Sequence, residues 1–375
     1  MLYAVESGRP LRRGWTTGAC ATAAAKAAYT ALVGGGFPDP VEITLPRGQH
    51  VAFALAETSR GPESATAGVV KDAGDDPDVT HGALIRATVT LAPPGSGVIF
   101  KSGPGVGTIT RPGLPLPPGE PAINPVPRRM IRDAISQVAA SFGRQPDVVV
   151  EISVPAGEAL AQRTLNGRLG IVGGLSILGT TGIVVPYSCA AWIDSIHRGI
   201  DVARAAGIEH VAGATGSSSE AAVRALHGLP EIALLEMGDF VGGMLKYLRA
   251  HPVRRVTVAG GVAKMTKLAQ GRLDLHSRRG TTDLRALAEL AHARGGSEAA
   301  VSRIAAANTV AEAFAISDVP LGDAVAAAAW TVAAAVLRPV PIELELVVFD
   351  RAGALLGRHG FAAVDEVHQD LKPSR

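Results

Sequence analysis

The feature that most constrains the fold is a regular alternation of strand and helix patterns in the second half of the chain. Apolar strands are expected at 210–214, 232–236 and 255–259, and each is followed by a helical pattern. Successive parallel strands need a crossover of this length, because the chain must return to the same end of the sheet before the next strand begins. The alternation therefore predicts α/β architecture with a parallel sheet. A helix over 190–206 precedes it, helical patterns follow over 282–337, and 342–349 with 354–357 suggests a closing hairpin.

The first half has a different pattern, in which strands follow one another through short turns. A long Ala-rich helix is expected over 14–33, with Thr16 or Thr17 as its N-cap. Strand patterns follow at 41–45, 50–57, 66–70, 83–91, 98–101 and 148–154, with one amphipathic helix at 128–140. Strands in direct succession favour an α+β domain with an antiparallel or mixed sheet.

The length of 375 residues predicts two domains, because a single core rarely grows beyond roughly 250–300 residues. We expect an α+β domain over 1–165, a glycine-rich crossover over 166–188 and an α/β domain over 189–375. The segment 102–127 is rich in proline and glycine, so no helix or ladder of its own is predicted there. Because a helix follows it directly, an ordered lid or wall is favoured over a disordered linker.

Charge and cysteine content exclude several classes of protein. The 36 basic and 34 acidic residues leave a formal charge of +2, which argues against a general nucleic-acid binder. Cys20 and Cys189 form no metal-binding spacing and are interpreted as small buried residues in a reducing compartment. No signal-peptide pattern begins the chain, and the longest charge-free apolar run, 324–337, is too short to span a bilayer. The sequence predicts a soluble cytoplasmic protein without a membrane partner, and a homo-oligomer is compatible with it.

An acidic loop at 68–82, GVVKDAGDDPDVTHG, separates two expected strands. Its ionisable residues are Lys71, Asp72, Asp75, Asp76, Asp78 and His81. The calcium-loop pattern of the EF-hand is absent, although magnesium held by one or two carboxylates is an alternative. Turn formation explains the aspartates equally simply, and a lone histidine is more often structural than catalytic. We therefore predict no metal site and leave acid–base chemistry open.

Small polar residues follow three expected parallel strands. They are AGATGSSS at 212–219, EMGDFVGG at 236–243, and Gly260-Gly261 with Lys264 and Lys267 in the next helix. Ligands of parallel α/β sheets bind at the carboxyl ends of the strands. Neither GxGxxG nor GxxxxGK[ST] is present, and ordinary helix caps and tight turns explain each stretch by itself. All three at one sheet edge favour a nucleotide-like ligand.

Several long stretches resemble one family. They are TTGACATAAAKAA at 16–28, VVKDAGDDPDVTHG at 69–82, GVGTITRPGLPLPPGEPAINPVPRRMI at 105–131, NGRLGIVGGLSILGTTGIVVPYS at 166–188, GDFVGGMLKYL at 238–248 and KLAQGRLDLHS at 267–277. From about residue 12 to residue 350 the chain resembles the CbiD family, the cobalt-precorrin-5B (C1)-methyltransferases of anaerobic cobalamin biosynthesis. The resemblance implies an N-terminal domain similar to the second domain of ribosomal protein S5 and a C-terminal Rossmann-like domain.

The resemblance also implies methyl transfer from S-adenosylmethionine to C1 of cobalt-precorrin-5B, giving cobalt-precorrin-6A, with cobalt present only in the corrinoid substrate. We expect the cofactor at Gly213, Thr215, Gly216, Ser217, Glu236 and Asp239. We expect the carboxylate-rich substrate at Lys71, Asp72, Asp78, Arg111, Arg128 and Arg168. Asp76 or His81 would take a proton from the ring.

The chain departs from the family pattern at two strand ends. A Gly-Gly-Arg-Ser-Glu-like turn is replaced by GSSSE at 216–220, and a Gly-His-X-Gly-Lys-like run by GGVAK at 260–264. No contact of the absent arginine or histidine is carried over. Two alternatives remain: a non-enzymatic tetrapyrrole carrier or pathway partner, and a small-molecule kinase, which lacks support because TTGACATAAAK is not a phosphate loop.

Overall fold

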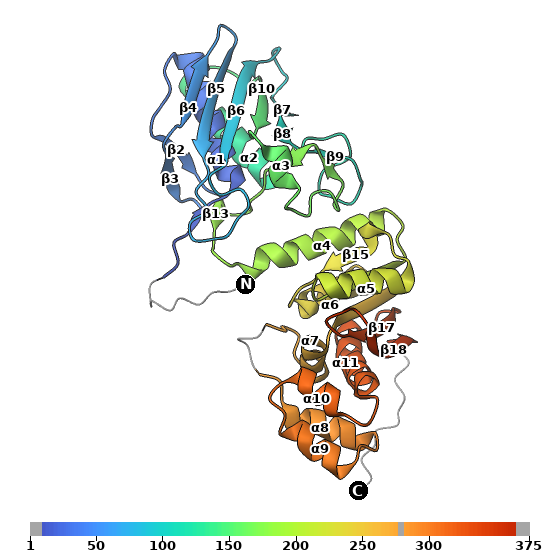
Figure 1. Cartoon of the computed structure of the whole chain (residues 1–375). Coiled ribbons are helices and arrows are strands. Elements are labelled where there is room, and N and C mark those ends of the chain that lie inside the picture. The colour runs from blue at the N-terminus through green and yellow to red at the C-terminus, as the bar shows by residue number, and fades with distance from the viewer. Residues whose placement is uncertain (1–9, 277–280, 365–375) are drawn as a thin grey trace. The chain divides into compact units, whose positions relative to one another are not determined.

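The computed structural model describes residues 10–276 and 281–364 and divides the chain into two units, Met1–Cys189 and Ala190–Arg375 (Figure 1). The expected domain ends 1–9 and 365–375 lie outside the described residues, as does Ser277 of the last family-like stretch. Both units combine helices with a sheet, which confirms the expected two-domain α/β organisation.

Unit 1 is built on a mixed five-stranded sheet. Its strands, in spatial order, are β4 (Glu57–Arg60), β5 (Ser64–Val70), β6 (Leu84–Leu91), β10 (Val148–Ser153) and β7 (Val98–Ser102). All neighbours are antiparallel except β10 and β7, so the predicted mixed sheet is confirmed. Alternate residues such as Ala67, Ala87 and Val150 are fully buried, and these side chains form one core with the two long helices of the unit.

Those helices are α1 (Thr17–Gly34) and α2 (Pro125–Ser141), which pack against each other (Figure 1). The hydroxyl oxygen of Thr16 accepts from the N–H of Ala19, which confirms the expected N-cap, so α1 begins at Thr17 rather than at residue 14. Gly35, at φ 89°, donates to Ala31 O and ends the helix one residue after the expected position 33. Small residues allow a close approach: a Cβ on Gly18 would lie 2.7 Å from Pro127. Cys20 is buried as expected, whereas Cys189 is only partly buried.

The two glycine-rich segments pair with each other, so the expectation that 102–127 has no ladder of its own is wrong. Strand β8 (Gly105–Val106) pairs with β12 (Gly174–Leu175), and β9 (Thr108–Ile109) pairs with β11 (Ile171–Val172). The partners are so distant in sequence that no local pattern marks them. Helix α2 also begins earlier than the expected residue 128, because prolines fit the first turn of a helix.

Two short strand pairs and a short helix complete the described part of unit 1. Strand β1 (Gly14–Trp15) pairs with β13 (Ile183–Val184), and β2 (Val41–Thr44) forms a hairpin with β3 (His50–Phe53). The short helix α3 (Gly157–Ala161) lies beside β8 and β12. Residues 166–188 therefore belong to the sheets of unit 1.

Unit 2 contains the predicted parallel sheet. Its strands, in spatial order, are β15 (Leu234–Glu236), β14 (His210–Ala214), β16 (Arg255–Gly261), β17 (Glu343–Phe349) and β18 (Leu355–Ala363). The first four are parallel, and β17 with β18 forms the expected closing hairpin. The chain moves from β14 to β15 on one side and then to β16 on the other, so the strand order reverses at β14.

The helices of unit 2 lie on the two faces of this sheet or pack on the helices that cover it. They are α4 (Cys189–Ala205), α5 (Ser217–His227), α6 (Val241–Ala250), α7 (Val262–Ala269), α8 (Leu284–Ala293), α9 (Glu298–Ala305), α10 (Val310–Ile316) and α11 (Leu321–Leu337), with a 3₁₀ turn at Glu231–Ala233. Val223 of α5 packs on one face with Ala212 and Val347, whereas the other face packs on α6, α7 and α11. Within the described ranges, no helix is both long and apolar enough to cross a membrane.

Candidate functional site

The carboxyl end of β14 presents an open backbone at the start of α5. The N–H of Thr215 donates to Ala259 O at 3.0 Å, which fixes the turn to β16. The Ser219 hydroxyl accepts from the N–H of Gly216 and donates to its carbonyl, so the turn is held from within. A Cβ on Gly216 would meet nothing within 4 Å, and Ser217 is exposed. The Gly216 N–H is already used by Ser219, so the backbone N–H of Ser217, in the first turn of α5, is the donor offered to a ligand.

Gly213, one residue before the end of β14, lies deeper than the other expected cofactor residues. A Cβ there would lie 2.3 Å from Met244 Sδ and 3.0 Å from Met237 Sδ. The absence of a side chain at this position therefore makes room for core methionines.

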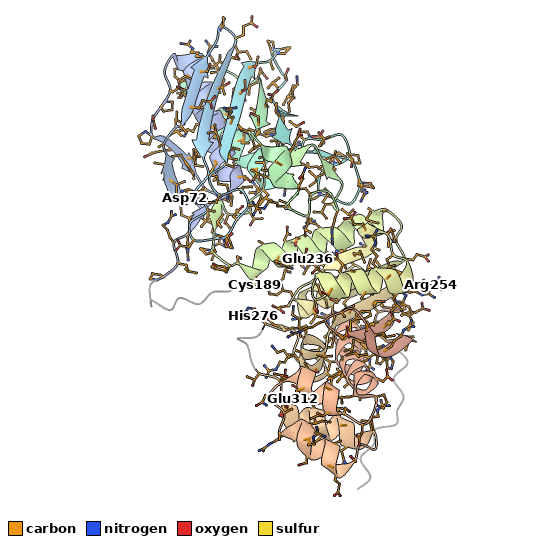
Figure 2. All side chains as sticks on the ribbon, viewed as in Figure 1. Asp72, Cys189, Glu236, Arg254, His276 and Glu312 are labelled. Carbon is orange, nitrogen blue, oxygen red and sulfur yellow. The ribbon has the colours of Figure 1, made fainter. Side chains whose placement is uncertain are left out.

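The end of β15 and the loop after it place two acidic residues at the same edge of the sheet. The indole N–H of Trp192 donates to the carbonyl of Glu236 at 3.0 Å, and Figure 2 labels Glu236 at the end of this strand. Asp239 lies three residues later, with its side chain 23% exposed. Its Oδ1 is buried and accepts no hydrogen bond from any described residue, although Lys264 Nζ lies 3.2 Å away as an ion-pair contact. Carboxylates at strand ends are suited to ribose hydroxyls.

Lys264 connects these elements; the sequence placed it beside the third strand end but not among the expected cofactor contacts. Its Nζ donates to the carbonyl of Thr215 at 2.7 Å and also lies beside Asp239. The sequence carried one signal, a lysine in the first turn of an expected helix, where the helix dipole disfavours a cation.

In unit 1, the acidic loop is anchored to residues near the start of the chain. The guanidinium of Arg12 pairs with Asp72 through both nitrogens, and the Arg12 N–H donates to Asp75 at 2.6 Å. The hydrogen bond from Arg12, followed by that from Gly74 N–H, lowers the pKa of Asp72 to about 2. A Cβ on Gly74 would lie 2.1 Å from Arg12 O, so the two backbones are in direct contact. Figure 2 labels Asp72 in this loop.

Lys71 and Asp78 form a largely buried ion pair. Lys71 Nζ lies 2.7 Å from Asp78 Oδ2, with the lysine side chain 1% exposed and the aspartate side chain 26% exposed. The other carboxylate oxygen accepts from the N–H and the hydroxyl of Thr80. Burial works to raise the pKa of Asp78, but Lys71 and the bonds from Thr80 outweigh it, so the pKa lies below its usual value.

The two expected proton acceptors are also bound to backbone N–H groups. Asp76 Oδ1 accepts from the N–H of Tyr187 at 2.7 Å, and His81 Nδ1 accepts from the N–H of Ala73 at 3.1 Å. Each loop side chain thus has its own partner. Across residues 10–276 and 281–364, no group of three or more His, Cys, Asp or Glu side chains is arranged to hold a metal ion.

The expected basic residues lie in two different environments, one buried and one exposed. Arg128 is buried: its guanidinium donates to the carbonyls of Pro121 and Ile123, pairs with Glu120 at 2.8 Å, and lies 5.1 Å from the Phe100 ring centre. Arg111 is exposed, and its Nη1 donates to the carbonyl of Arg168 at 3.2 Å. The structure thus brings Arg111 and Arg168 together, whereas Arg128 braces the loop 120–123.

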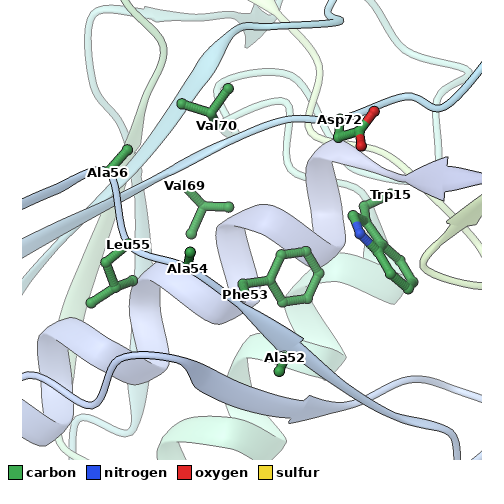
Figure 3. A pocket seen from close by; sticks show the side chains of 9 residues that line it. All are labelled: Trp15, Ala52, Phe53, Ala54, Leu55, Ala56, Val69, Val70 and Asp72. Carbon is green, nitrogen blue, oxygen red and sulfur yellow. The ribbon is translucent and has the colours of Figure 1, made fainter.

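A pocket of about 270 Å³ opens beside the acidic loop, within unit 1 (Figure 3). Trp15 and Phe53, whose ring centres are 5.3 Å apart in an edge-to-face arrangement, form one wall. The remaining lining residues are Ala52, Ala54, Leu55, Ala56, Val69, Val70 and Asp72. Its lining side chains are apolar apart from the Asp72 carboxylate and the indole N–H of Trp15.

Comparison with known proteins gives matches along most of the chain. The CbiD family model matches residues 4–186, and the model of the CbiD C-terminal domain matches residues 274–360. A protein of Agrobacterium fabrum named cobalt-precorrin-5B C(1)-methyltransferase is 63% identical over 354 residues, covering 94% of this chain and 93% of that protein. A protein of the same name from Methylorubrum extorquens is 60% identical and covers 92% and 97%.

A solved structure is also similar. It is the crystal structure of cobalamin biosynthesis protein (cbiD) from Archaeoglobus fulgidus, 28% identical, covering 72% of this chain and 83% of that chain with a TM-score of 0.39. The family models and the two relatives agree with one another, and the expected resemblance is confirmed. The chain belongs to the CbiD family.

Proposed function

We propose that this protein transfers a methyl group from S-adenosylmethionine to C1 of cobalt-precorrin-5B, giving cobalt-precorrin-6A. The observation that carries the proposal is 63% identity, over almost the whole length of both chains, to a relative with that activity in its name. We further infer that unit 2 is Rossmann-like, because its strand order reverses beside a strand end with an open backbone donor. Unit 1 is inferred to resemble the second domain of ribosomal protein S5.

In this proposal, the strand ends of unit 2 bind S-adenosylmethionine. Ser217 offers a backbone N–H group, Gly216 leaves open space beside it, and Glu236 and Asp239 offer carboxylates to the ribose. Gly213 and Thr215 contribute to the shape of the site. Gly213 makes room for Met244, and Thr215 is hydrogen-bonded to Ala259 and Lys264.

The reaction is an in-line displacement. The methyl–sulfur bond breaks with its electron pair remaining on sulfur, which leaves S-adenosylhomocysteine, while the ring carbon supplies the pair for the new carbon–carbon bond. Such a step depends on proximity and alignment more than on an acid or a base. The residues of this chain are therefore proposed to act mainly by binding and orientation.

Unit 1 is proposed to bind the corrinoid. Arg111 and Arg168 are adjacent and suit the carboxylates of the macrocycle. Lys71, Asp72, Asp78 and Arg128 are each engaged by protein groups, so we infer that they shape the loops around the substrate.

Of the two candidate proton acceptors, the hydrogen bonds favour Asp76. His81 Nδ1 accepts from Ala73 N–H, so the neutral ring carries its hydrogen on Nε2 and has no basic nitrogen to spare. Asp76 uses Oδ1 for Tyr187 and keeps Oδ2 as a further acceptor. Asp76→Asn preserves the bond to Tyr187 and tests this role: slower transfer with unchanged substrate affinity is expected.

The activity is tested by anaerobic incubation with the C1-unmethylated precursor and labelled S-adenosylmethionine, followed by mass spectrometry. Transfer of one labelled methyl group is expected. The absence of transfer with every metal state of the substrate would overturn the proposal, and corrinoid binding without S-adenosylmethionine binding would indicate a carrier.

Cofactor placement is tested by Gly216→Phe, with Gly360→Phe as a matched control, because a Cβ at either glycine meets nothing within 4 Å. The new ring at 216 would cover the start of α5, so affinity for S-adenosylmethionine measured by calorimetry should fall at least about tenfold, the effect of losing roughly 1.4 kcal/mol of binding free energy. The control should bind normally. Equal affinities of both variants would place the cofactor elsewhere.

A further inference from the structure

Lys264 occupies a position that is unfavourable for a cation in isolation. It lies in the first turn of α7, where unpaired backbone N–H groups already give the helix end a partial positive charge. The side chain is 37% exposed, but the ammonium is directed to protein groups: it contacts the Thr215 carbonyl at 2.7 Å and the Asp239 carboxylate at 3.2 Å. The contacts with Thr215 and Asp239 therefore explain why a lysine occupies this position.

Through these two contacts, Lys264 ties together the ends of three neighbouring strands. Thr215 directly follows β14, Asp239 belongs to the loop after β15, and Lys264 itself lies in the helix that follows β16. Thr215 is also fixed from the other side, because its N–H donates to Ala259 O. One end of the bridge is therefore rigid.

At the other end, Lys264 is the contact that orients the Asp239 side chain. The backbone of this loop is already fixed, since the N–H groups of Met237 and Gly238 donate to Ala214 O and the Asp239 carbonyl accepts from Leu275 N–H. Within the described part of the chain, Asp239 Oδ1 accepts no hydrogen bond and has only the nearby Lys264 charge. With Oδ1 buried beside Lys264, the carboxylate has a fixed direction, and its other oxygen, Oδ2, is left to accept a hydrogen bond from a ribose hydroxyl.

We propose that Lys264 is the positioning residue of the cofactor site, and that it orients Asp239 to accept a hydrogen bond from the ribose 2′-hydroxyl of an adenosyl ligand. This inference rests on the proposed binding of S-adenosylmethionine at the strand ends of unit 2. Lys264 acts through Asp239 and is not assigned any contact with the reacting methyl group.

The test uses the full-length chain and two probes, S-adenosylhomocysteine and its 2′-deoxyribose analogue, with binding measured by calorimetry. The wild type should prefer the ribose compound about tenfold, the effect of one hydrogen bond to a charged group. Lys264→Met should weaken binding of the ribose compound about tenfold and leave the 2′-deoxy analogue nearly unchanged, so that the preference disappears. A purely structural loss would weaken both probes equally, and that result would overturn the proposal.

Three further variants complete the design. Lys264→Arg keeps a cation and should restore most of the preference, whereas Lys246→Met, which removes an exposed lysine from α6, should bind both probes as the wild type does. Asp239→Asn should abolish the preference, and adding Lys264→Met to it should cause no further loss, which keeps the proposal testable if the single lysine variant folds poorly. Additive losses in this pair would contradict action through Asp239.

The failures of the two proposals are distinguishable. A wild type that binds neither probe would overturn both the cofactor placement and the role of Lys264. A wild type that prefers the ribose compound, together with a Lys264→Met variant that keeps the same preference, would overturn the role of Lys264 alone.

Discussion

At the scale of single residues, the charged side chains of unit 1 are matched to specific partners. Lys71 is almost completely buried, and its ammonium faces one oxygen of Asp78 while Thr80 binds the other. Burying an unpaired charge lowers stability far more than burying a paired one. Removal of one partner therefore destabilises the folded protein, because the other charge is left buried without compensation.

Asp78→Asn should therefore destabilise the protein. We expect a loss of about 3 kcal/mol in the free energy of unfolding, the lower end for breaking a buried pair, because Asp78 itself is 26% exposed. Urea unfolding at pH 7 measures it, and Glu63→Gln, the same chemical change at an exposed position, should stay within about 0.5 kcal/mol. A loss for Asp78→Asn no larger than that of the control would contradict this explanation.

The sequence predicted which residues are polar and constrained in the acidic loop, but not their partners. Asp76 bonds to Tyr187 and Asp75 to Arg12, both far away along the chain. Turn propensity acts locally and is visible in sequence, whereas the choice of a distant backbone N–H depends on the finished packing. The bridge made by Lys264 was missed for the same reason.

At the scale of elements, the two glycine-rich segments are held together by close backbone contacts. Gly105, Gly157 and Gly174 meet where β8, α3 and β12 come together: a Cβ on either of the last two would lie 2.2 Å from Gly105 O. The long helices and parallel strands were predictable because their periodic patterns extend over many residues. These two-residue strands were not, since their pairing depends on distant glycines rather than on periodicity.

Gly174→Ala should consequently destabilise unit 1, by about 1–3 kcal/mol or more, because the added methyl group would press on backbone that cannot rotate away. Gly167→Ala adds the same group where nothing lies within 4 Å and should be nearly neutral. The midpoints of thermal unfolding of the two variants are compared. Equal midpoints would show that the two glycine-rich segments can move apart without loss of stability.

Arg128 supports the same region through a different type of contact. Arg128→Met removes its bonds to Pro121, Ile123 and Glu120, so the loop 108–123 should exchange amide hydrogens faster. Exposed Arg129→Met serves as the control. Hydrogen-exchange mass spectrometry should show faster exchange in that loop with little change in β5 and β6, and uniform protection in both variants would argue against a bracing role.

At the scale of the whole molecule, the two units should respond to acid at different pH. In unit 2, burial and then the neighbouring His227 lower the pKa of His210 to about 4, and burial also lowers the pKa of His197. Both rings bind protons more readily in the unfolded chain, near pH 6.5. The stability of unit 2 is therefore fully present above that pH and declines as the pH falls from about 6.5 toward 4.

Unit 1 should lose stability only at lower pH than unit 2. The pKa values of Asp72 and Asp78 lie below their usual value, so their contribution persists above about pH 4 and is lost as the pH falls further. Between pH 7 and 5, hydrogen exchange corrected for its intrinsic rate should accelerate in β14 and β16 but not in β5 and β6. His210→Gln should reduce the acceleration in unit 2, and simultaneous loss of protection in both units would contradict the assignment.

The pairing of β1 with β13 has a consequence for the order in which unit 1 can be completed. Gly14 pairs with Val184, so about 170 further residues must be synthesised after Gly14 before the first strand can pair with its partner. Trp15, which lines the pocket of unit 1, lies in that strand. The hydrogen bond between Asp76 and Tyr187 can form only after residue 187 has also been synthesised. During synthesis, then, the helices and central sheet of unit 1 can form early, but the pocket and the anchored acidic loop are finished only when the last residues of the unit arrive.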